Sequence, residues 1–364
     1  MIPVYVLPPQ LPASPYMDRL YTPLAQQASD IELRRGRARV ELLRLLLGRG
    51  PRILHLHFFD ELTQRPGQLV TALRSLAFVL LVVLLRLRGV ELIWTAHNIV
   101  PHELHHPRWA SFVYRKVAHY SSVIITHSEA ARRAVRERYL GSIPPQHASA
   151  RCVVIPHGHY IGHYGPIQER KASRALLGLP EHGPLTLCIG ALRPYKHIEG
   201  LIAAFASLPE AERGTLLIAG WAKAQHYAQT LQAYAAQVPG VHLELRYIAD
   251  SDMASYLGAA DIVALPYHRL LTSGVLLLAL SYARPVLAPD LASVRELIHD
   301  GQNGFLFEPD TPTSLAQCLQ RALTEPHSEQ RDAQALASAA AFDWEQIAKQ
   351  LAALYRELGM NVAS

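Results

Sequence analysis

The feature that most constrains the fold of this chain is the regular alternation of short apolar runs with longer helical patterns. Such alternation is typical of parallel β-strands joined by crossover helices. The expected strands are residues 1–6, 53–57, 91–95, 122–126, 151–155, 185–190, 215–219, 241–247, 261–265, 285–288 and 304–307. We therefore predict an α/β protein built on parallel sheets.

A break in this alternation divides the chain. Residues 159–183 are rich in Gly, His and Tyr and then polar, and the pattern restarts at Leu185. The 364 residues suffice for two α/β domains. We predict two Rossmann-like domains whose parallel sheets face each other across a cleft. The expected divisions are an N-terminal domain at 1–165, a linker at 166–183, a C-terminal domain at 184–342 and a final helix at 343–364 that could cross back to the first domain.

The cysteines and the N-terminus indicate the cellular compartment. Cys152, Cys188 and Cys318 are widely spaced, which excludes a disulfide framework and a zinc ribbon and fits a reducing compartment. The N-terminal segment lacks a basic leader before its apolar stretch, so we interpret it as the first strand and not as a signal peptide. We expect the protein to be cytoplasmic.

One apolar segment requires a choice between a core helix and a membrane helix. Residues 76–85 form an unbroken apolar run of ten, bracketed by Arg74, Arg86 and Arg88. A bilayer span needs about 20 apolar residues. We predict a buried helix between two strands; a helix partly inserted at a membrane surface is the alternative.

Positive charge is concentrated in the first half of the chain. Residues 1–165 contain 20 Lys or Arg against 10 Asp or Glu, whereas residues 166–364 contain 15 against 20. The arginines are not interleaved with aromatic residues, which disfavours nucleic acid. An anionic membrane surface, or an acceptor that carries a lipid diphosphate, fits better. The alternative is that these basic residues lie on a solvated helix face and bind no partner. The clusters are Arg34, Arg35, Arg37 and Arg39, and Arg132, Arg133, Arg136 and Arg138.

Two motifs in the second half predict a diphosphate site. Gly190 to Lys196 follows an expected strand and precedes a helix, so Arg193 and Lys196 are placed at a strand end where such folds bind ligands. Thr272-Ser273-Gly274 opens a second helix, where Ser and Thr cap orphan amides and Gly lets an anion approach. A basic turn and a simple helix cap are the alternative interpretations. Two such sites in one domain favour a nucleoside diphosphate.

A wider set of motifs lies in order along residues 50–290. The set is His55-Leu56-His57 with Asp60, Thr95 to Asn98 with Pro101-His102-Glu103, His157 to Tyr160, Gly190 to Lys196, Thr272 to Gly274 and Ala283 to Pro289. It resembles that of the GT-B glycosyltransferases, and more narrowly the xanthan-type β-mannosyltransferases. The resemblance implies transfer of mannose from GDP-mannose to a lipid-linked oligosaccharide in exopolysaccharide biosynthesis. We accordingly expect a peripheral protein on the inner face of the cell membrane.

The chain departs from the retaining GT-B enzymes at two positions. Those enzymes carry two glutamates eight positions apart, where alignment on Arg284-Pro285-Val286 places Leu270 and Leu278. The missing carboxylates favour the inverting group and leave the contacts to the donor sugar unassigned.

The expected chemistry divides between the two domains. Negative charge builds on the leaving diphosphate, and we expect Arg193, Lys196 and the amides at Ser273 and Gly274 to stabilise it. Gly190, Tyr195 and Thr272 are expected beside these groups. No metal or cofactor beyond the nucleotide sugar is then required. The base that takes the acceptor proton is expected in the first domain. Asp60 is the first candidate and His97 the second, with Glu61 and Glu103 behind them; a helix cap or a loop ion pair is the alternative for each.

Other residues are assigned to substrate contacts. His157 and His159 are expected at the donor or acceptor, and the backbone of Tyr247 and Ile248 at the nucleobase. We interpret Asp250 and Asp252 as helix capping and not as a metal motif. A metal site at His102, His105 and His106 lacks acidic or cysteine partners apart from Glu103.

Three functions compete at this stage. The first is the inverting mannosyltransferase, or the same transfer with a UDP- or ADP-sugar. The second is an inactive GT-B relic that binds nucleotide or glycan without transfer. The third is a sugar-nucleotide epimerase of similar build. Release of nucleoside diphosphate separates the first two, and release of free sugar or an epimer would reveal the third.

Overall fold

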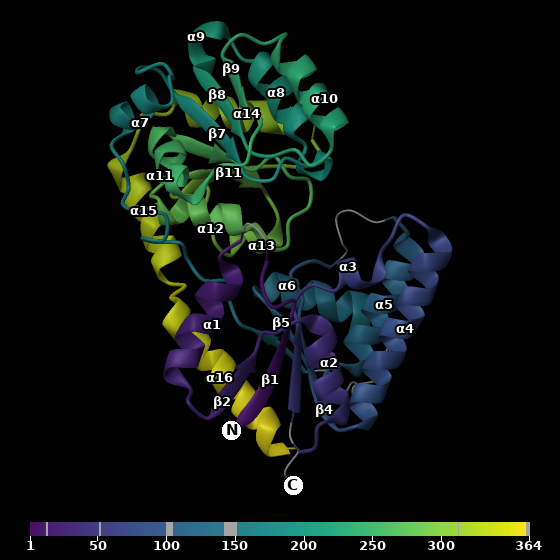
Figure 1. The fold of residues 1–364 in the computed structure, drawn as a ribbon. Coiled ribbons are helices and arrows are strands. Elements are labelled where there is room, and N and C mark those ends of the chain that lie inside the picture. The colour runs from purple at the N-terminus through teal and green to yellow at the C-terminus, as the bar shows by residue number, and fades with distance from the viewer. Residues whose placement is uncertain (12–13, 51, 100–104, 142–150, 312, 362–364) are drawn as a thin grey trace. The chain divides into compact units, whose positions relative to one another are not determined.

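The structure is a computed structural model that describes residues 1–11, 14–50, 52–99, 105–141, 151–311 and 313–361. The chain forms two compact units. The first comprises Met1–Gly158 and Phe342–Ser364, and the second His159–Ala341 (Figure 1). Each is an α/β domain on a six-stranded sheet in which every strand pair is parallel. The prediction of two Rossmann-like α/β domains is confirmed.

The first sheet has the order β2-β1-β3-β4-β5-β6. Its strands are β1 Ile2–Leu7, β2 Ile31–Arg34, β3 Arg52–Leu56, β4 Val90–Thr95, β5 Val123–Thr126 and β6 Arg151–Val154. Strand β2 escaped the sequence analysis because it lies at the sheet edge, where only Ile31 is fully buried and Glu32 pairs with Arg34. A strand with so short an apolar face gives little periodic signal.

Helices cover both faces of the first sheet. They are α1 Tyr16–Gln27, α2 Ala38–Leu47, α3 Asp60–Thr63, α4 Gln68–Leu87, α5 Pro107–Tyr120, α6 Glu129–Val135 with a π-helical turn at Arg136–Leu140, and α16 Trp344–Asn361. One core cluster joins the sheet to α2, α4 and α5, and another joins it to α1 and α16. The C-terminal helix therefore completes the first unit. Ser128 caps the start of α6, since its Oγ accepts the amide of Ala131 at 3.1 Å.

Helix α4 is buried along one face only. Thr71, Ser75, Phe78, Val82 and Leu85 face the core. Six leucines on its other side are 43–78% exposed. The prediction of a buried core helix is thus wrong for half of its surface, because a helix that is apolar all round shows no periodicity by which its outer face could be recognised.

The second sheet has the order β12-β11-β10-β7-β8-β9. Its strands are β7 Leu185–Ile189, β8 Thr215–Ala219, β9 Val241–Glu244, β10 Ile262–Ala264, β11 Val286–Pro289 and β12 Gly304–Phe307. Its helices are α7 Arg170–Leu176, α8 Ile198–Ala206, α9 Glu210–Arg213, α10 Gln225–Ala235, α11 Asp250–Ala259, α12 Gly274–Ser281, α13 Ala292–Arg295, α14 Ser314–Thr324 and α15 Glu329–Ala340, with a 3₁₀ turn at Pro194–Lys196. One core cluster packs α8, α10 and α14 on this sheet.

The boundary between the units lies between Gly158 and His159, seven residues before the predicted end of the first domain. The segment that follows is held by α12 of the second unit. Tyr160 N donates to Ser281 Oγ at 2.9 Å, and Tyr164 N donates to the Tyr282 hydroxyl at 3.1 Å. These contacts tie the predicted end of the first domain to the second unit.

Candidate active site

The strand order of the second unit places a ligand site between β7 and β10. From β7 the chain continues to β8 and β9 on one side, whereas β10, β11 and β12 lie on the other. At such a switch point the loops leaving neighbouring strands diverge and open a crevice at the carboxyl edge of the sheet. The loop after β7 carries Gly190 to Lys196, and the loop after β10 leads to Ser273 and α12. Both predicted motifs therefore lie at this point.

Gly190 brings the two motifs together. It has a φ of 109°, which favours glycine. A Cβ atom added to it would lie 3.4 Å from Val275 Cγ2 and 3.7 Å from Lys196 Nζ. The Lys196 ammonium and the first turn of α12 thus meet beside Gly190. Gly220, after β8, allows the same loop to pack closely, since its own Cβ would lie 1.8 Å from the Gly190 carbonyl oxygen.

Lys196 is a buried cation. Its side chain is only 7% exposed, and Nζ lies 5.3 Å from the centroid of the Tyr267 ring. The pKa of Lys196 is lowered to about 8, mainly by burial and also by the neighbouring Arg193 cation, while Cys188 acts in the opposite direction. Lys196 forms no ion pair with any described residue. A buried charge without a counterion is costly, so this position favours an anionic ligand.

The start of α12 adds neutral donors to this cation. Ser273 is the N-cap, and its Oγ accepts the amide of Leu276 at 3.2 Å. Amides of the first turn have no partner within a helix and attract anions. The Oγ1 of Thr272 is buried and bonds to none of the residues that the structure describes. Thr272, Ser273 and Gly274 are therefore arranged as expected for an anion site.

Arg193 and Tyr195 complete this loop. Arg193 is half-buried at the start of the 3₁₀ turn, and its loop is fixed by a bond from Leu192 N to Trp221 O at 3.0 Å. Tyr195 is 36% exposed, with its ring 6.3 Å from that of Tyr267. Tyr267 was not assigned a role from the sequence, although it directly follows the predicted strand and Pro266.

The residues expected at the nucleobase lie farther along the same sheet edge. Tyr247 and Ile248 follow β9, which is separated from β7 by β8. Tyr247 is 53% exposed and Ile248 is buried. The Tyr247 carbonyl accepts from Arg246 Nη1 at 3.3 Å, so one of the expected backbone groups already has a partner. Asp250 and Asp252 lie in the first turn of α11, where neither caps the helix by its side chain.

Asp60 is the acidic residue that follows β3 in the first unit. It begins α3, and the Tyr114 hydroxyl donates to its Oδ2 at 3.0 Å. Its Oδ1 is buried and bonds to none of the described residues. Burial raises the pKa of Asp60 to about 6, although the Tyr114 bond acts in the opposite direction. A carboxylate with one fixed and one unbonded oxygen, and a pKa near neutrality, suits a general base.

His97 lies within a chain of buried histidines. His57 Nδ1 lies 3.1 Å from His97 Nε2, and His127 Nε2 lies 3.3 Å from His97 Nδ1. The chain continues from His57 Nε2 to the Tyr21 hydroxyl at 2.7 Å. Its other end is the Ile155 carbonyl, 2.9 Å from His127 Nδ1.

The carbonyl at the end of this histidine chain sets the direction of every bond in it. A carbonyl only accepts, so His127 Nδ1 carries the proton and neutral His127 accepts through Nε2. His97 must then donate through Nδ1 and accept through Nε2 from His57. Both ring nitrogens of His97 are thus occupied, which disfavours it as the base. Burial holds the pKa of His97 and of His57 well below the usual range.

The remaining predicted site residues do not lie together in one unit. His157 is buried against Tyr16 and Trp344, and its Nδ1 donates to the Gly158 carbonyl at 2.8 Å. The structure therefore favours core packing for His157, contrary to the prediction of substrate contact. His159 belongs to the second unit, where its Nδ1 accepts from Ile161 N at 3.2 Å. His102 and Glu103 lie outside the described residues. Within the described ranges no group of three or more His, Cys, Asp or Glu could hold a metal ion.

Comparison with known proteins agrees with this geometry. The family described as "Glycosyl transferases group 1" matches residues 183–325. A GDP-mannose:glycolipid 4-beta-D-mannosyltransferase of Xanthomonas campestris pv. campestris is 28% identical over 301 residues, covering 82% of this chain and 76% of the relative. A D-inositol 3-phosphate glycosyltransferase of Kineococcus radiotolerans is 29% identical over 252 residues, covering 64% and 56%.

Solved structures show the same fold over the whole chain. Anabaena Alr3699/HepE, in complex with UDP and glucose, gives a TM-score of 0.66 at 18% identity and covers 98% of this chain and 100% of that one. WaaG, a glycosyltransferase involved in lipopolysaccharide biosynthesis, gives 0.67 at 16% identity and covers 97% and 99%. Residues 183–325 form a glycosyl transferase group 1 domain, and the chain has the GT-B fold.

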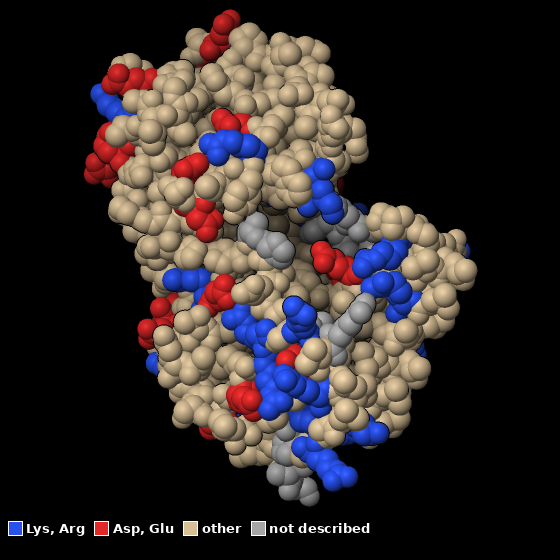
Figure 2. Space-filling model, in the orientation of Figure 1, with Lys and Arg blue, Asp and Glu red and all other residues tan. Residues whose placement is uncertain are grey.

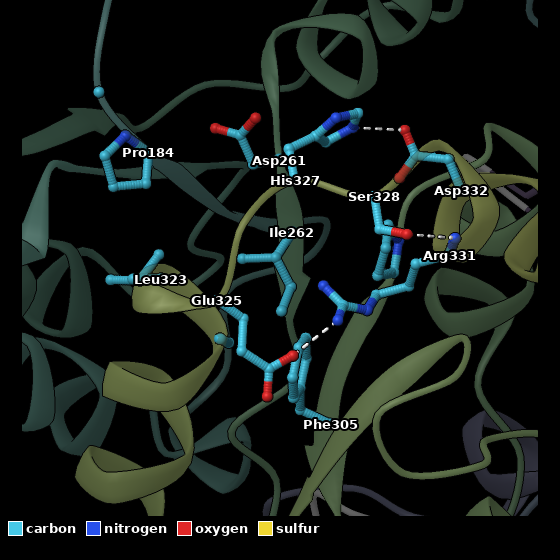
Figure 3. A pocket seen from close by; sticks show the side chains of 13 residues that line it. Pro184, Asp261, Ile262, Phe305, Leu323, Glu325, His327, Ser328, Arg331 and Asp332 are labelled. Atoms are coloured by element: carbon cyan, nitrogen blue, oxygen red, sulfur yellow. Dashed lines mark hydrogen bonds and ion pairs between the residues drawn. The ribbon is translucent and has the colours of Figure 1, made fainter.

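A pocket of this glycosyltransferase lies away from the candidate site. It has a volume of about 240 Å³ and lies at the amino edge of the second sheet (Figure 3). Pro184, Asp261 and Pro285 line it just before β7, β10 and β11, beside Arg331 of α15. The switch-point loops lie at the opposite edge. The pocket is therefore separate from the candidate site.

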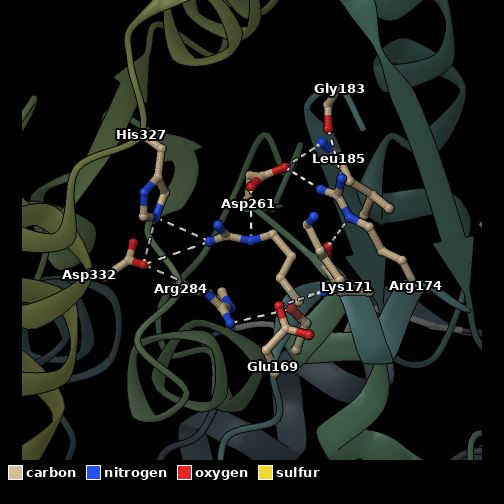
Figure 4. Close-up of polar contacts among 12 residues, drawn as sticks. Glu169, Lys171, Arg174, Gly183, Leu185, Asp261, Arg284, His327 and Asp332 are labelled. Carbon is tan, nitrogen blue, oxygen red and sulfur yellow. Dashed lines mark hydrogen bonds and ion pairs between the residues drawn. The ribbon is translucent and has the colours of Figure 1, made fainter. Parts of the chain in front are cut away.

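An ionic cluster beside this pocket explains its charged lining. Arg174 Nη2 lies 2.6 Å from Asp261 Oδ2, which also accepts the amide of Leu185 at 2.7 Å (Figure 4). Arg284 pairs with Asp332 at 3.5 Å. The cluster fixes α7 and α15 to the starts of the strands, so we assign it to stability.

Gly158 lets the Trp344 ring pack closely against the backbone of the first unit, because it lacks a side chain. A Cβ atom there would lie 2.2 Å from the Trp344 ring. Because a buried ring has no room to move, Gly158→Ala is expected to destabilise the first unit by about 1–3 kcal/mol. Urea unfolding measures this effect, with Gly67→Ala as the control, since its nearest neighbour would lie at 3.8 Å. Equal midpoints for the two variants would contradict the packing seen here.

Proposed function

We propose that this glycosyltransferase inverts the anomeric centre of GDP-mannose and transfers mannose to a lipid-linked oligosaccharide in exopolysaccharide biosynthesis. The observation that carries the proposal is the buried Lys196 ammonium, which has no ion-pair partner among the described residues and lies beside the first turn of α12 at the switch point. The choice of GDP-mannose and of a glycolipid acceptor follows the Xanthomonas relative. The absence of carboxylates at Leu270 and Leu278 supports inversion.

The proposed reaction separates the sugar from its diphosphate while a base activates the acceptor. The bond between the anomeric carbon and the diphosphate oxygen breaks, and negative charge passes to the diphosphate. Lys196, Arg193 and the amides at the start of α12 stabilise that charge. These groups supply the positive potential from the protein itself, so the scheme requires no metal. The acceptor oxygen attacks the opposite face of the sugar as its proton passes to Asp60 Oδ1.

We further propose that the protein works in the cytoplasm on the inner face of the cell membrane. The lipid-linked acceptor requires such a position. The excess of Lys and Arg in residues 1–165 supports attraction to anionic headgroups. In Figure 2 blue side chains gather on the visible face of the first unit.

Nucleoside diphosphate release tests the function. Purified protein is incubated with GDP-mannose, UDP-glucose or ADP-glucose and a lipid-linked oligosaccharide acceptor, and the released diphosphate and the anomeric configuration of the product are measured. We expect acceptor-dependent release from GDP-mannose and an inverted product. Release from a UDP- or ADP-sugar would replace the donor in the proposal. Binding without release would support the inactive relic, and an epimerised donor the epimerase.

Lys196→Met is expected to weaken GDP binding at least tenfold, because a fixed buried cation is lost. The thermal shift produced by saturating GDP reports the change through mass action. Affinity of the native protein should also fall above about pH 8, since the pKa of Lys196 lies near that value and the neutral amine attracts phosphate less. Exposed Lys223→Met in the same unit is the control. Unchanged affinity in Lys196→Met would remove Lys196 from the site.

A further inference from the structure

Helix α4 carries a continuous stripe of exposed leucines. The stripe consists of Leu69, Leu73, Leu76, Leu80, Leu84 and Leu87, which are 72, 60, 50, 59, 43 and 78% exposed. Steps of three and four residues place all six on one side of a helix, along about 27 Å. They lie opposite the buried face that packs on the sheet. Leucines exposed in so long a row are not accounted for by the fold of the first unit.

Helix α2 extends this apolar surface. It packs in the same core cluster as α4, and Arg88 Nη1 at the end of α4 donates to the Leu46 carbonyl at 2.9 Å. Val40, Leu43 and Leu47 of α2 are 44, 56 and 71% exposed. Figure 1 shows α2 and α4 in the same helical layer of the unit. We call these three residues and the six leucines the α2–α4 surface.

The charges around the α2–α4 surface are almost all positive. Among the described side chains of the two helices and their following turns, the basic residues are Arg44, Arg49, Arg74, Arg86 and Arg88, of which Arg86 pairs with Glu91 at 2.8 Å. Glu41 is the single carboxylate in these segments; it is 3% exposed and accepts from Arg44 at 2.8 Å. An apolar stripe bordered by cations and without exposed carboxylates matches the layering of a bilayer with anionic headgroups.

Two other occupants fit these observations less well. Helix α4 is long and apolar enough to span a membrane, with 20 residues and a mean hydropathy of 2.2, but a third of that segment is buried in the unit. Spanning would require Phe78, Val82 and Leu85 to leave the core. A second copy on the same surface would bring the arginines of both copies together without carboxylates to pair them, and like charges at an interface oppose association.

We propose that the α2–α4 surface embeds in the headgroup–acyl boundary of an anionic bilayer, with the axis of α4 parallel to the membrane plane. The apolar stripe supplies the insertion and the bordering arginines supply the attraction. This inference rests on the proposed function, since it names the surface through which the enzyme reaches a lipid-linked acceptor. Partitioning on vesicles is measured without donor or acceptor, so it succeeds or fails independently of transfer.

Vesicle co-sedimentation of the full chain tests the surface. The probes are phosphatidylcholine vesicles with and without 30% phosphatidylglycerol, a composition of about the anionic content used to mimic bacterial membranes. We expect binding to the anionic vesicles, and at least a tenfold loss in the double variant Leu76→Ser/Leu80→Ser. The matched control is Leu176→Ser on α7 of the second unit, where the leucine is 73% exposed. Equal binding of all three proteins would overturn the proposal.

Insertion is distinguished from mere attraction by a dye. Native Cys152, Cys188 and Cys318 are buried, so a cysteine introduced by Leu80→Cys can be labelled selectively. An environment-sensitive dye there should shift to the blue with anionic vesicles, whereas the same dye at Leu176→Cys should not. No shift at position 80 would contradict insertion. Light scattering without lipid measures the molecular mass and so tests whether a second copy occupies the surface. If the native protein were a dimer and Leu76→Ser/Leu80→Ser a monomer, the surface would be a dimer interface and the proposal would be overturned.

Discussion

Replacing Asp60 by asparagine is expected to lower turnover by about 10²- to 10⁴-fold, the usual contribution of a general base. The amide keeps the shape of the carboxyl and can still accept the Tyr114 hydroxyl bond seen at 3.0 Å. It cannot take a proton from the acceptor. Initial rates of diphosphate release with saturating donor and acceptor measure the loss, and GDP binding should be unchanged because the variant leaves the second unit intact.

The pH dependence of turnover separates catalysis by Asp60 from a structural role. Because the pKa of Asp60 is raised to about 6, the base is lost as the pH falls through that value, and the native enzyme should show an acid limb there. Tyr114→Phe removes a bond that favours the charged carboxylate, so it should move the acid limb to higher pH. The neighbouring Glu61→Gln is the control, and it should retain near-native rates. A fully active Asp60→Asn would transfer the role of base to another residue.

Acidification is expected to unfold the first unit well before the carboxylates of an ordinary domain are protonated. Burial lowers the pKa of His55 and of His157 to about 3 and that of His127 to about 4. The unfolded chain binds protons on these rings from about pH 6.5 downward, whereas the folded unit does not. Stability is therefore fully present above pH 6.5 and is lost as the pH falls toward 4.

The size of this acid effect follows from the number of rings. Each buried neutral histidine removes about 1.4 kcal/mol per pH unit below 6.5. Three of them amount to on the order of 5 kcal/mol by pH 5, comparable to the whole stability of many domains. Asp60 offsets a small part, because its raised pKa makes the folded carboxyl bind a proton first as the pH falls below about 6.

Urea unfolding between pH 7.5 and 5 measures the acid effect. His127→Gln should flatten the dependence on pH, since it removes one buried titrating ring. The control His226→Gln changes an exposed histidine on α10 and should leave the slope as in the native protein. If the free energy of unfolding of the first unit did not change between these pH values, the histidine chain would have to be open to water.

The sequence was sufficient to predict most strands of the two sheets and the place of two motifs at strand ends of the second unit. Strand positions follow from local runs of apolar residues, and Gly190 to Lys196 and Thr272 to Gly274 are contiguous motifs whose place at strand ends can be inferred directly. That the two motifs meet depends on β7 and β10 being neighbours, which no local pattern contains. The burial of Lys196 against Tyr267 likewise requires the strand order.

The first unit shows why other features could not be predicted. The histidine chain draws His57, His97 and His127 from three different strand ends and Tyr21 from α1, so it exists only once the strands lie in order. His97 was predicted as a candidate base and His157 as a substrate contact, because strand-end position alone does not distinguish a site from a core. The outward leucines of α4 were missed for a related reason: hydrophobicity indicates burial but does not indicate what covers each face.

The return of the C-terminal helix to the first unit has a consequence for how the protein is made. Tyr355 of α16 lies 2.6 Å from His55 Nδ1 on β3, so residues some 300 positions apart share one core. During synthesis the ribosome completes the whole second unit before α16 emerges. The first domain must therefore wait with one face of its sheet and α1 uncovered until α16 arrives, and this interval is where we expect the nascent chain to depend most on chaperones.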